Sequence, residues 1–284
     1  MKHVVMYSGG VGSFMAAKRV IETFGVAATV LLFTDTKMED EDLYRFIKES
    51  TRYLEAEFIK ISDGRDVWQV FNDVRFLGNS RIAPCTRILK QDLARTWIEK
   101  SFVPDEVVLY VGIDWTEAHR IEKIKNKWAP YIVSAPLMDE PYLSKNDIFK
   151  VLEDIGIEKP KLYSLGFSHN NCGGFCCKAG QGHFVNLLEK LPDRFAYHEK
   201  KEDEMREKLG KDVSILKKQK NNKVFPYTLK QLRVDFENKN QQIDLYDIGG
   251  CGCFIEESQC EYIVSTSSAV KIIKRYIGLL NPNY

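Results

Sequence analysis

The sequence of 284 residues carries seven cysteines, and five of them lie in two short groups that contain glycine. One group spans residues 172–177 and the other residues 251–253, and glycines between the thiols leave space for two side chains to turn toward one centre. Four thiolates suffice for a tetrahedral zinc site or a [4Fe-4S] cluster. The predicted metal ligands are Cys172, Cys176, Cys251 and Cys253.

The identity of this metal site stays open at the level of the sequence. Cys177 is an alternative to Cys176, and His169 and His183 are alternative nitrogen ligands. Soft thiolates suit zinc and iron alike, so the ligand types do not separate the two metals. The competing interpretation is a set of buried, metal-free cysteines that act as small apolar side chains.

A second chemical feature is the glycine-rich stretch Ser8-Gly9-Gly10-Val11-Gly12-Ser13. It lies between an apolar run, His3 to Tyr7, and an amphipathic run, Phe14 to Phe24, which together predict a strand, a tight turn and a helix. The first amides of such a helix, with the positive end of its dipole, form a phosphate site. The competing interpretation is an ordinary tight connection between a strand and a helix.

Charged residues follow later predicted strands. Asp35 ends the second strand, and cations surround a helix that is predicted to begin at Pro84: Arg75, Arg81, Arg87 and Lys90. Gly112, Glu117 and Arg120 follow the fourth strand. Arginine can hold two phosphate oxygens at once, so these positions suit a polyphosphate. The alternatives are a helix N-cap for Asp35, a solvated face for the cations, and an exposed ion pair between Glu117 and Arg120.

Strands and helices alternate along the first part of the chain. This order predicts an α/β fold, a Rossmann-like doubly wound parallel sheet of about five strands with ligands at the carboxyl ends of the strands. The predicted strands are His3–Tyr7, Ala28–Phe33, Phe58–Ile61, Glu106–Val111 and Tyr131–Leu137. Helices are predicted over Glu39–Tyr53 and from Ser144 to a stop at Gly156.

The composition changes at Pro160, which predicts two units. We expect residues 1–160 to form the domain with the phosphate-binding loop, and residues 161–284 to form a smaller, mainly helical, Cys-rich metal-binding domain. Helical runs are expected at 184–209 and 228–238, the second with a capping box between Thr228 and Gln231. Residues 217–223 are expected to form a basic polar loop.

Composition narrows the class of protein. The 41 basic and 40 acidic residues give a net charge of +1, which argues against a bulk nucleic-acid binder but not against a local basic groove. No stretch approaches the roughly 20 apolar residues that span a bilayer, so no membrane partner is expected. An odd number of cysteines without a secretion signal argues against a disulfide framework. We expect a cytoplasmic protein.

Three segments, taken in order, resemble the PP-loop superfamily of adenine nucleotide alpha-hydrolase-like proteins, and within it the PAPS-reductase-like group. Ser8-Gly9-Gly10-x-x-Ser13 resembles the S-G-G-x-D-S loop, and Cys85-Thr86-x-x-Leu89-Lys90 resembles the C-T-x-x-L-K segment. Residues 112–120 resemble the G-x-x-x-x-E-x-x-R segment. The resemblance covers residues 1–160, and it has one departure, because Gly12 stands where the family usually has Asp.

The resemblance implies an ATP pyrophosphatase that forms AMP and adenylates a substrate for sulfur or nitrogen transfer, including transfer to nucleic acid. The implied cofactors are ATP and Mg²⁺, and some members also carry iron–sulfur clusters. Asp35 would lie near the nucleoside, and Arg87, Lys90 and Arg120 would neutralise charge on the leaving group. The residues implied to hold the nucleotide are Ser8, Gly9, Gly10, Gly12, Ser13 and Gly112.

Two other functions compete with this one. The first is a PAPS or sulfonucleotide reductase, in which Cys85 would be the attacking thiol because it lies among arginines before a helix. The second is a nucleotide-binding or nucleic-acid-binding partner with weakened catalysis. Its basic residues for tRNA or DNA would be Lys217, Lys218, Lys220 and Lys223. Gly12 favours binding over turnover, and the acceptor substrate and oligomeric state stay open.

Overall fold

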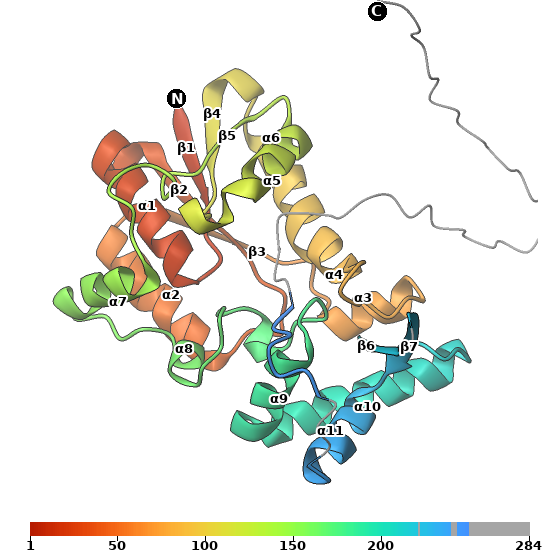
Figure 1. Cartoon of the computed structure of the whole chain (residues 1–284). Coiled ribbons are helices and arrows are strands. Elements are labelled where there is room, and N and C mark those ends of the chain that lie inside the picture. Colours follow the sequence, from red (N-terminus) through yellow and green to blue (C-terminus); the bar gives the residue numbers. More distant parts are fainter. Residues whose placement is uncertain (221, 240–242, 250–284) are drawn as a thin grey trace, which may run out of the picture.

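The computed structural model describes residues 1–220, 222–239 and 243–249. Its centre is a five-stranded, fully parallel sheet in the order β3-β2-β1-β4-β5 (Figure 1). The strands are β1 (Lys2–Met6), β2 (Thr29–Thr34), β3 (Glu57–Ile61), β4 (Val107–Tyr110) and β5 (Ile132–Ser134). The predicted α/β doubly wound sheet is confirmed, and the central strands are short, apolar runs because both of their faces are covered.

Helices pack on both faces of this sheet. Val5 of β1 points toward α1 (Val11–Phe24), α2 (Glu41–Leu54) and α7 (Lys145–Asp154). The adjacent Val4 points toward the opposite face, which α5 (Leu93–Ser101) and α6 (Ile121–Trp128) cover. Successive side chains of a strand alternate between faces, so β1 contributes to two separate apolar cores.

Local sequence signals set several helix ends. Ser144 is the N-cap of α7, as predicted, and forms a reciprocal capping box with Asp147. The predicted capping box between Thr228 and Gln231 begins α11 (Leu229–Glu237). Asp40 caps α2 by accepting a hydrogen bond from the Asp42 amide. Asp35 is therefore not the N-cap of that helix.

The chain between β3 and β4 contains α-helices and a π-helical turn. It contains α3 (Val67–Asp73), then α4 (Pro84–Thr86), which continues through a π-helical turn, Arg87–Asp92, into α5. Pro84 stands at the first helical position, as predicted, where its missing N–H costs nothing. Short 3₁₀ helices complete this half at 26–28, 104–106 and 115–120.

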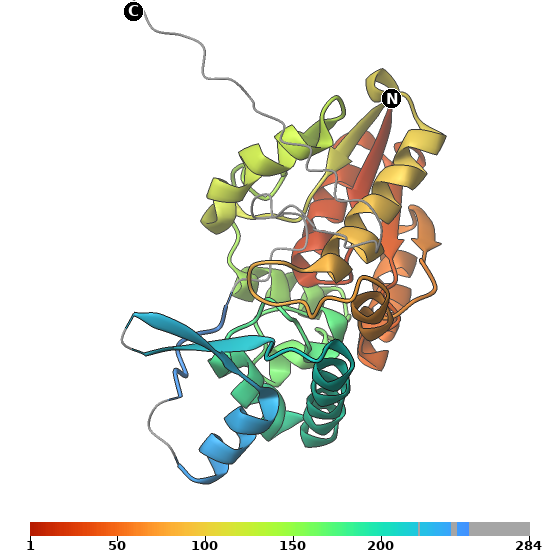
Figure 2. The same ribbon diagram turned by 90° about the vertical axis from the view of Figure 1, so that its right-hand side faces the viewer.

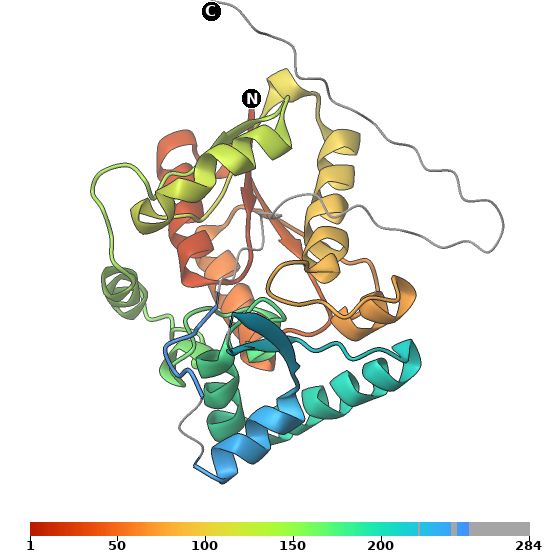
Figure 3. The same cartoon turned by 45° about the vertical axis from the view of Figure 1, so that its right-hand side comes forward.

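The part after residue 160 gathers below the sheet (Figures 1 and 3). It contains a 3₁₀ turn at 172–174 and the elements α8 (Lys161–Ser164), α9 (Gln181–Lys190), α10 (Pro192–Leu209), β6 (Leu216–Lys220), β7 (Lys223–Tyr227) and α11. Within the described ranges, none of the helices has the length and apolar character that crossing a bilayer requires.

Two expectations for this part were wrong in detail. The helical run expected at 184–209 is two helices, because Pro192 cannot donate a hydrogen bond inside a helix and begins α10 instead. The segment 217–223, expected to be a loop, belongs to the antiparallel hairpin β6–β7. Its lysines interrupt the alternation of apolar and polar residues that would predict a strand. Leu216 and Tyr227, both buried, pair at the base of the hairpin.

A third apolar core joins the two predicted units. Val67, Phe71 and Leu89 from the first part pack with Phe175 and Phe184 from the second. Figure 2 shows α3 close to α10, and the two helices are in contact. The segment from α3 to the π-helical turn is therefore shared between the sheet and the C-terminal helices.

Candidate functional site

The Ser8–Ser13 loop connects β1 to α1 at the carboxyl edge of the sheet. The Ser13 hydroxyl donates to the Gly10 carbonyl at 2.8 Å, and the Ser8 amide donates to the Ser13 hydroxyl at 3.2 Å. The N-cap of α1 is Gly10, which has no side chain to cap the first amides of the helix. The turn is thus held by its own serines, and the helix N-terminus keeps the donors that suit an anion.

Gly12 and Gly112 meet where α1 passes the end of β4. A methyl group at Gly12 would lie 2.9 Å from the Gly112 carbonyl oxygen, and one at Gly112 would lie 2.7 Å from the Ser13 amide nitrogen. Both distances are too short for real contacts. The glycine at position 12 therefore permits this close approach, and an Asp there would force the two backbones apart.

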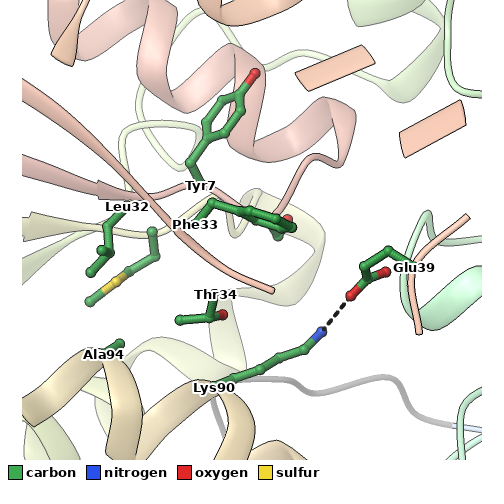
Figure 4. A pocket seen from close by; sticks show the side chains of 9 residues that line it. Tyr7, Leu32, Phe33, Thr34, Glu39, Lys90 and Ala94 are labelled. Atoms are coloured by element: carbon green, nitrogen blue, oxygen red, sulfur yellow. Dashed lines mark ion pairs between the residues drawn. The ribbon is translucent and has the colours of Figure 1, made fainter. Parts of the chain in front are cut away.

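A small pocket opens beside the loop, between the end of β2 and the π-helical turn (Figure 4). Lys90 points across it toward Glu39, with Lys90 Nζ 3.8 Å from Glu39 Oε1 (Figure 4). The pocket encloses about 20 Å³, which is space for about one water molecule. It is lined by Met6, Tyr7, Ser8, Leu32, Phe33, Thr34, Glu39, Lys90 and Ala94.

The Lys90–Glu39 pair is nearly removed from solvent, with side-chain exposures of 9% and 2%. Glu39 also accepts hydrogen bonds from the Thr36 hydroxyl at 2.9 Å and from the Cys172 amide. Burial raises the pKa of Glu39, while the charge of Lys90 opposes that rise. The pair places one cation and one carboxylate directly beside the glycine-rich loop.

Asp35 follows Thr34, the last residue of β2, and its buried carboxylate has several partners. It accepts from Tyr44 Oη at 2.7 Å and from the Lys37 amide at 2.9 Å, and Lys60 Nζ lies 2.8 Å away. Burial acts to raise the pKa of Asp35, but these hydrogen bonds prevail and lower it to about 2. The carboxylate organises the turn after β2, and its predicted position near a nucleoside stays a prediction.

The two predicted arginines lie outside the pocket lining. Arg87, on the π-helical turn, has its Nε 4.0 Å from Asp92 Oδ2 and is about one-third exposed. Arg120 forms an i,i+3 ion pair with Glu117 and is 12% exposed. Of the three predicted phosphate-binding cations, Lys90 is the one that lines the pocket beside the loop.

Residues from the second half of the chain hold the loop, and the motifs did not reveal them. Asn170 Nδ2 donates to the Gly9 carbonyl at 3.1 Å, and the Val11 amide donates to Tyr163 Oη over a long 3.4 Å. Arg194 donates to Asp40 Oδ2 at 2.8 Å, beside the 172–174 turn. The polar run Ser168–Asn171 before the cysteines was the one sequence signal for such a role.

The described cysteines lie where the two halves of the chain meet. Cys85 Sγ and Cys177 Sγ are 3.8 Å apart, although 92 positions separate them. Hydrogen bonding from Cys177 lowers the pKa of Cys85, assisted by Lys90, whereas the same contact and burial raise the pKa of Cys177. Cys172 has a positive φ of 48° at the start of its 3₁₀ turn.

The predicted metal site is described only in part. Cys251 and Cys253 lie outside the described residues, and among those described no three His, Cys, Asp or Glu side chains form a metal-binding group. His183 Nε2 lies 2.7 Å from the Gly174 carbonyl oxygen, and burial lowers the pKa of His169 to about 4. Zinc or an iron–sulfur cluster on Cys172 and Cys176 stays a prediction.

The predicted basic residues for nucleic acid lie on the β6–β7 hairpin. An open groove of about 1040 Å³ there is lined by Lys217 and Lys218, but also by three aspartates. Lys218 Nζ already lies 2.6 Å from Asp235 Oδ2. The described groove is therefore mixed in charge rather than uniformly basic.

No family model matches the sequence, and a search of curated proteins finds no match. Among solved structures, the fold is similar to a PAPS reductase from Candida auris in a phosphate complex, with 11% identity over 59% of this chain and 80% of that chain and a TM-score of 0.40.

Two further structures are similar in fold. One is an NH₃-dependent NAD synthetase from Campylobacter jejuni subsp. jejuni with a nitrate ion, at 13% identity over 74% of this chain and 87% of that chain, TM-score 0.36. The other is a predicted tRNA methyltransferase subunit from Methanocaldococcus jannaschii. It is 16% identical over 57% of this chain and 92% of that chain, with a TM-score of 0.30. These likenesses concern the fold, and the function proposed below rests on the geometry of the site.

Proposed function

We propose that this protein binds an adenine nucleotide with the Ser8–Ser13 loop and cleaves ATP between the α and β phosphates. One observation carries the proposal: Ser8 of the glycine-rich loop and the buried cation Lys90 line the same pocket at the carboxyl edge of a parallel sheet, and the same loop leads into the N-terminus of α1. Ligands of doubly wound sheets bind at that edge, and backbone amides with a lysine are a recurrent phosphate-binding combination.

The proposed loop contacts follow from its hydrogen bonds. The first-turn amides of α1 would bind phosphate oxygens, and the only described contact of the Val11 amide, to Tyr163 Oη at 3.4 Å, is long enough to be exchanged readily. The Ser8 and Ser13 hydroxyls would add donors at the same turn. Gly12 would keep α1 close to the end of β4 beside the loop, because a side chain there would meet the Gly112 carbonyl oxygen.

The free volume of the pocket is small, about 20 Å³. A polyphosphate bound there would compete with the Glu39 carboxylate for Lys90, so the two side chains would have to separate. Lys90 would then neutralise charge that develops on the pyrophosphate leaving group. In the proposal, Arg87 and Arg120 add charge from outside this pocket once they leave Asp92 and Glu117.

The donor set near the loop also fits Mg²⁺. This ion takes oxygen ligands, usually one or two carboxylates together with substrate phosphates. Glu39 is the carboxylate that lines the pocket, and we propose that it holds the ion after releasing Lys90. When bound, Mg²⁺ would share in neutralising the pyrophosphate.

The nucleotide would adenylate an acceptor for sulfur or nitrogen transfer, with nucleic acid among the acceptor classes, which makes the protein a transferase in this proposal. The test is product analysis of Mg-ATP labelled at the α phosphate, with the full chain and with Lys90→Met and Lys100→Met variants. We expect AMP and pyrophosphate, lost in Lys90→Met and kept in Lys100→Met, whose side chain is exposed. ADP as the product, no product, or equal AMP from Lys90→Met would contradict the proposed cleavage.

A further inference from the structure

The contact between Cys85 and Cys177 takes no part in the nucleotide chemistry proposed above. Their sulfur atoms are 3.8 Å apart, and a disulfide requires about 2.05 Å, so a small movement brings them to bonding distance. Cys85 is partly exposed, whereas Cys177 is 2% exposed within the third apolar core. The two thiols thus differ in access to a reagent from solution.

The Cys85–Cys177 pair and the Lys90–Glu39 pair both connect the helix at residues 84–92 to the segment around the 172–174 turn. Cys85 lies five residues before Lys90 on one continuous helix, formed by α4 and the π-helical turn. Cys177 lies five residues after Cys172, whose amide donates to Glu39. Any change that fixes one sulfur to the other therefore also fixes the helix of Lys90 to the turn that holds Glu39.

We propose that Cys85 and Cys177 form a thiol–disulfide exchange site, and that its disulfide holds the Lys90–Glu39 pocket closed. The exchange needs an external low-molecular-weight disulfide, for which oxidised glutathione is the probe. The Cys85 thiolate attacks one sulfur of that disulfide, which breaks the S–S bond and releases one thiol. Cys177 then attacks Cys85 in the mixed disulfide, and the second small thiol leaves as the Cys85–Cys177 bond forms.

The balance is two protein thiols oxidised to one disulfide and one small disulfide reduced to two thiols. In the proposed order, the partly exposed Cys85 meets the reagent and the more deeply buried Cys177 resolves the intermediate. Gly78 packs beside Cys177, and a methyl group at Gly78 would lie 3.1 Å from the Cys177 sulfur.

The first experiment tests the chemistry alone. The full chain is equilibrated in glutathione buffers of varied ratio, remaining thiols are alkylated, and peptides are mapped by mass spectrometry. We expect a Cys85–Cys177 disulfide that dithiothreitol reverses, and Cys177→Ser should trap Cys85 as a mixed disulfide with glutathione. The neighbouring variant Cys176→Ser is the matched control and should form the Cys85–Cys177 bond normally.

Three results would overturn the exchange site: no disulfide at any ratio, a Cys85 disulfide with Cys172 or Cys176 instead, or a bound metal that holds both thiols and blocks exchange. Circular dichroism of each variant establishes that it folds. If Cys177→Ser does not fold, the disulfide map of the unmodified full chain still decides the question.

The second experiment tests the effect on the pocket, which rests on the proposed nucleotide function. Mg-ATP affinity is measured by calorimetry for the reduced and oxidised full chain. We expect about tenfold weaker binding after oxidation, an ordinary coupling between two sites, and recovery with dithiothreitol. Cys177→Ser should show no such change.

The outcomes separate the two proposals. Disulfide formation with no ATP binding in either state refutes the nucleotide function and leaves the exchange site standing. Disulfide formation with equal ATP affinity in both states refutes the closure of the pocket. ATP binding without any disulfide refutes the exchange site alone.

Discussion

Removing the Lys90 charge is the sharpest perturbation of the pocket. In Lys90→Met the side chain keeps its length, but Glu39, at 2% exposure, loses the cation 3.8 Å from its Oε1. Breaking a buried ion pair by removing one partner costs about 3–5 kcal/mol when the other charge stays buried. The Thr36 hydroxyl and the Cys172 amide still donate to Glu39, so the loss falls toward the lower figure.

Protonation of Glu39 limits this loss and makes it depend on pH. Neutralising a carboxyl of ordinary pKa costs about 3.5 kcal/mol at pH 7 and about 1 kcal/mol at pH 5, and burial, which raises the pKa of Glu39, lowers both values. We therefore expect Lys90→Met to lower the free energy of unfolding by about 2–3 kcal/mol at pH 7 and by less than about 1 kcal/mol at pH 5.

Urea denaturation followed by circular dichroism at both pH values measures the effect. The exposed Lys100→Met, on the same helical stretch, is the matched control and should change stability little at either pH. The double variant Lys90→Met with Glu39→Gln should recover much of the loss at pH 7. A Lys90→Met variant as stable as Lys100→Met at pH 7, or equally destabilised at both pH values, would refute a buried charge pair.

Three further predictions concern single positions. Gly12→Ala should destabilise the protein by about 1–3 kcal/mol in urea, because its methyl group would lie 2.9 Å from the Gly112 carbonyl oxygen; an unchanged midpoint would show that the approach is loose. Asp35→Asn should cost about 2 kcal/mol at pH 7, and the wild type should lose this contribution as pH falls from about 4 to 2, because the pKa of Asp35 is lowered to about 2; an equal cost at pH 2 would contradict this. Burial raises the pKa of Glu202 to about 7, so the folded state binds the extra proton and its contribution declines as pH rises from about 4.5 to 7; Glu202→Gln should lack that slope in a series of urea titrations, and an identical slope would refute the assignment.

The sheet was predictable because each strand carries its own signal. Five short apolar runs, each followed by a turn or a helix, gave the strands to within a few residues, and alternation along the chain gave their parallel direction. Pro84 and the capping box at Thr228 marked helix starts from local chemistry alone. The hairpin at 216–227 escaped because lysines replaced the expected apolar alternation.

The pairs of side chains that define the site could not be predicted from the sequence. Lys90 and Glu39 meet only through the π-helical turn and the bend after β2, and Cys85 and Cys177 meet across 92 positions. The motifs predicted Lys90 as a phosphate-binding cation and Cys85 as a candidate attacking thiol, but their partners follow only from the folded structure. The same packing shows that Gly12 is a point of close approach as well as a departure from a motif.

The central claim is that the first amides of α1 bind a nucleotide phosphate, and Val11→Pro tests it most directly. Proline at the first helical position removes one amide donor while preserving the helix, and the preceding Gly10 already has the extended conformation that proline requires. Glu41→Pro, at the same position of α2 after extended Asp40, is the matched control.

Calorimetric titration of the reduced full chain and both variants with Mg-ATP is the decisive measurement. The proposed site predicts that the wild type and Glu41→Pro bind alike and that Val11→Pro binds about 10- to 100-fold more weakly, the value of one hydrogen bond to a charged group. A wild type that does not bind Mg-ATP, or a Val11→Pro variant that binds as tightly as the wild type, would contradict it.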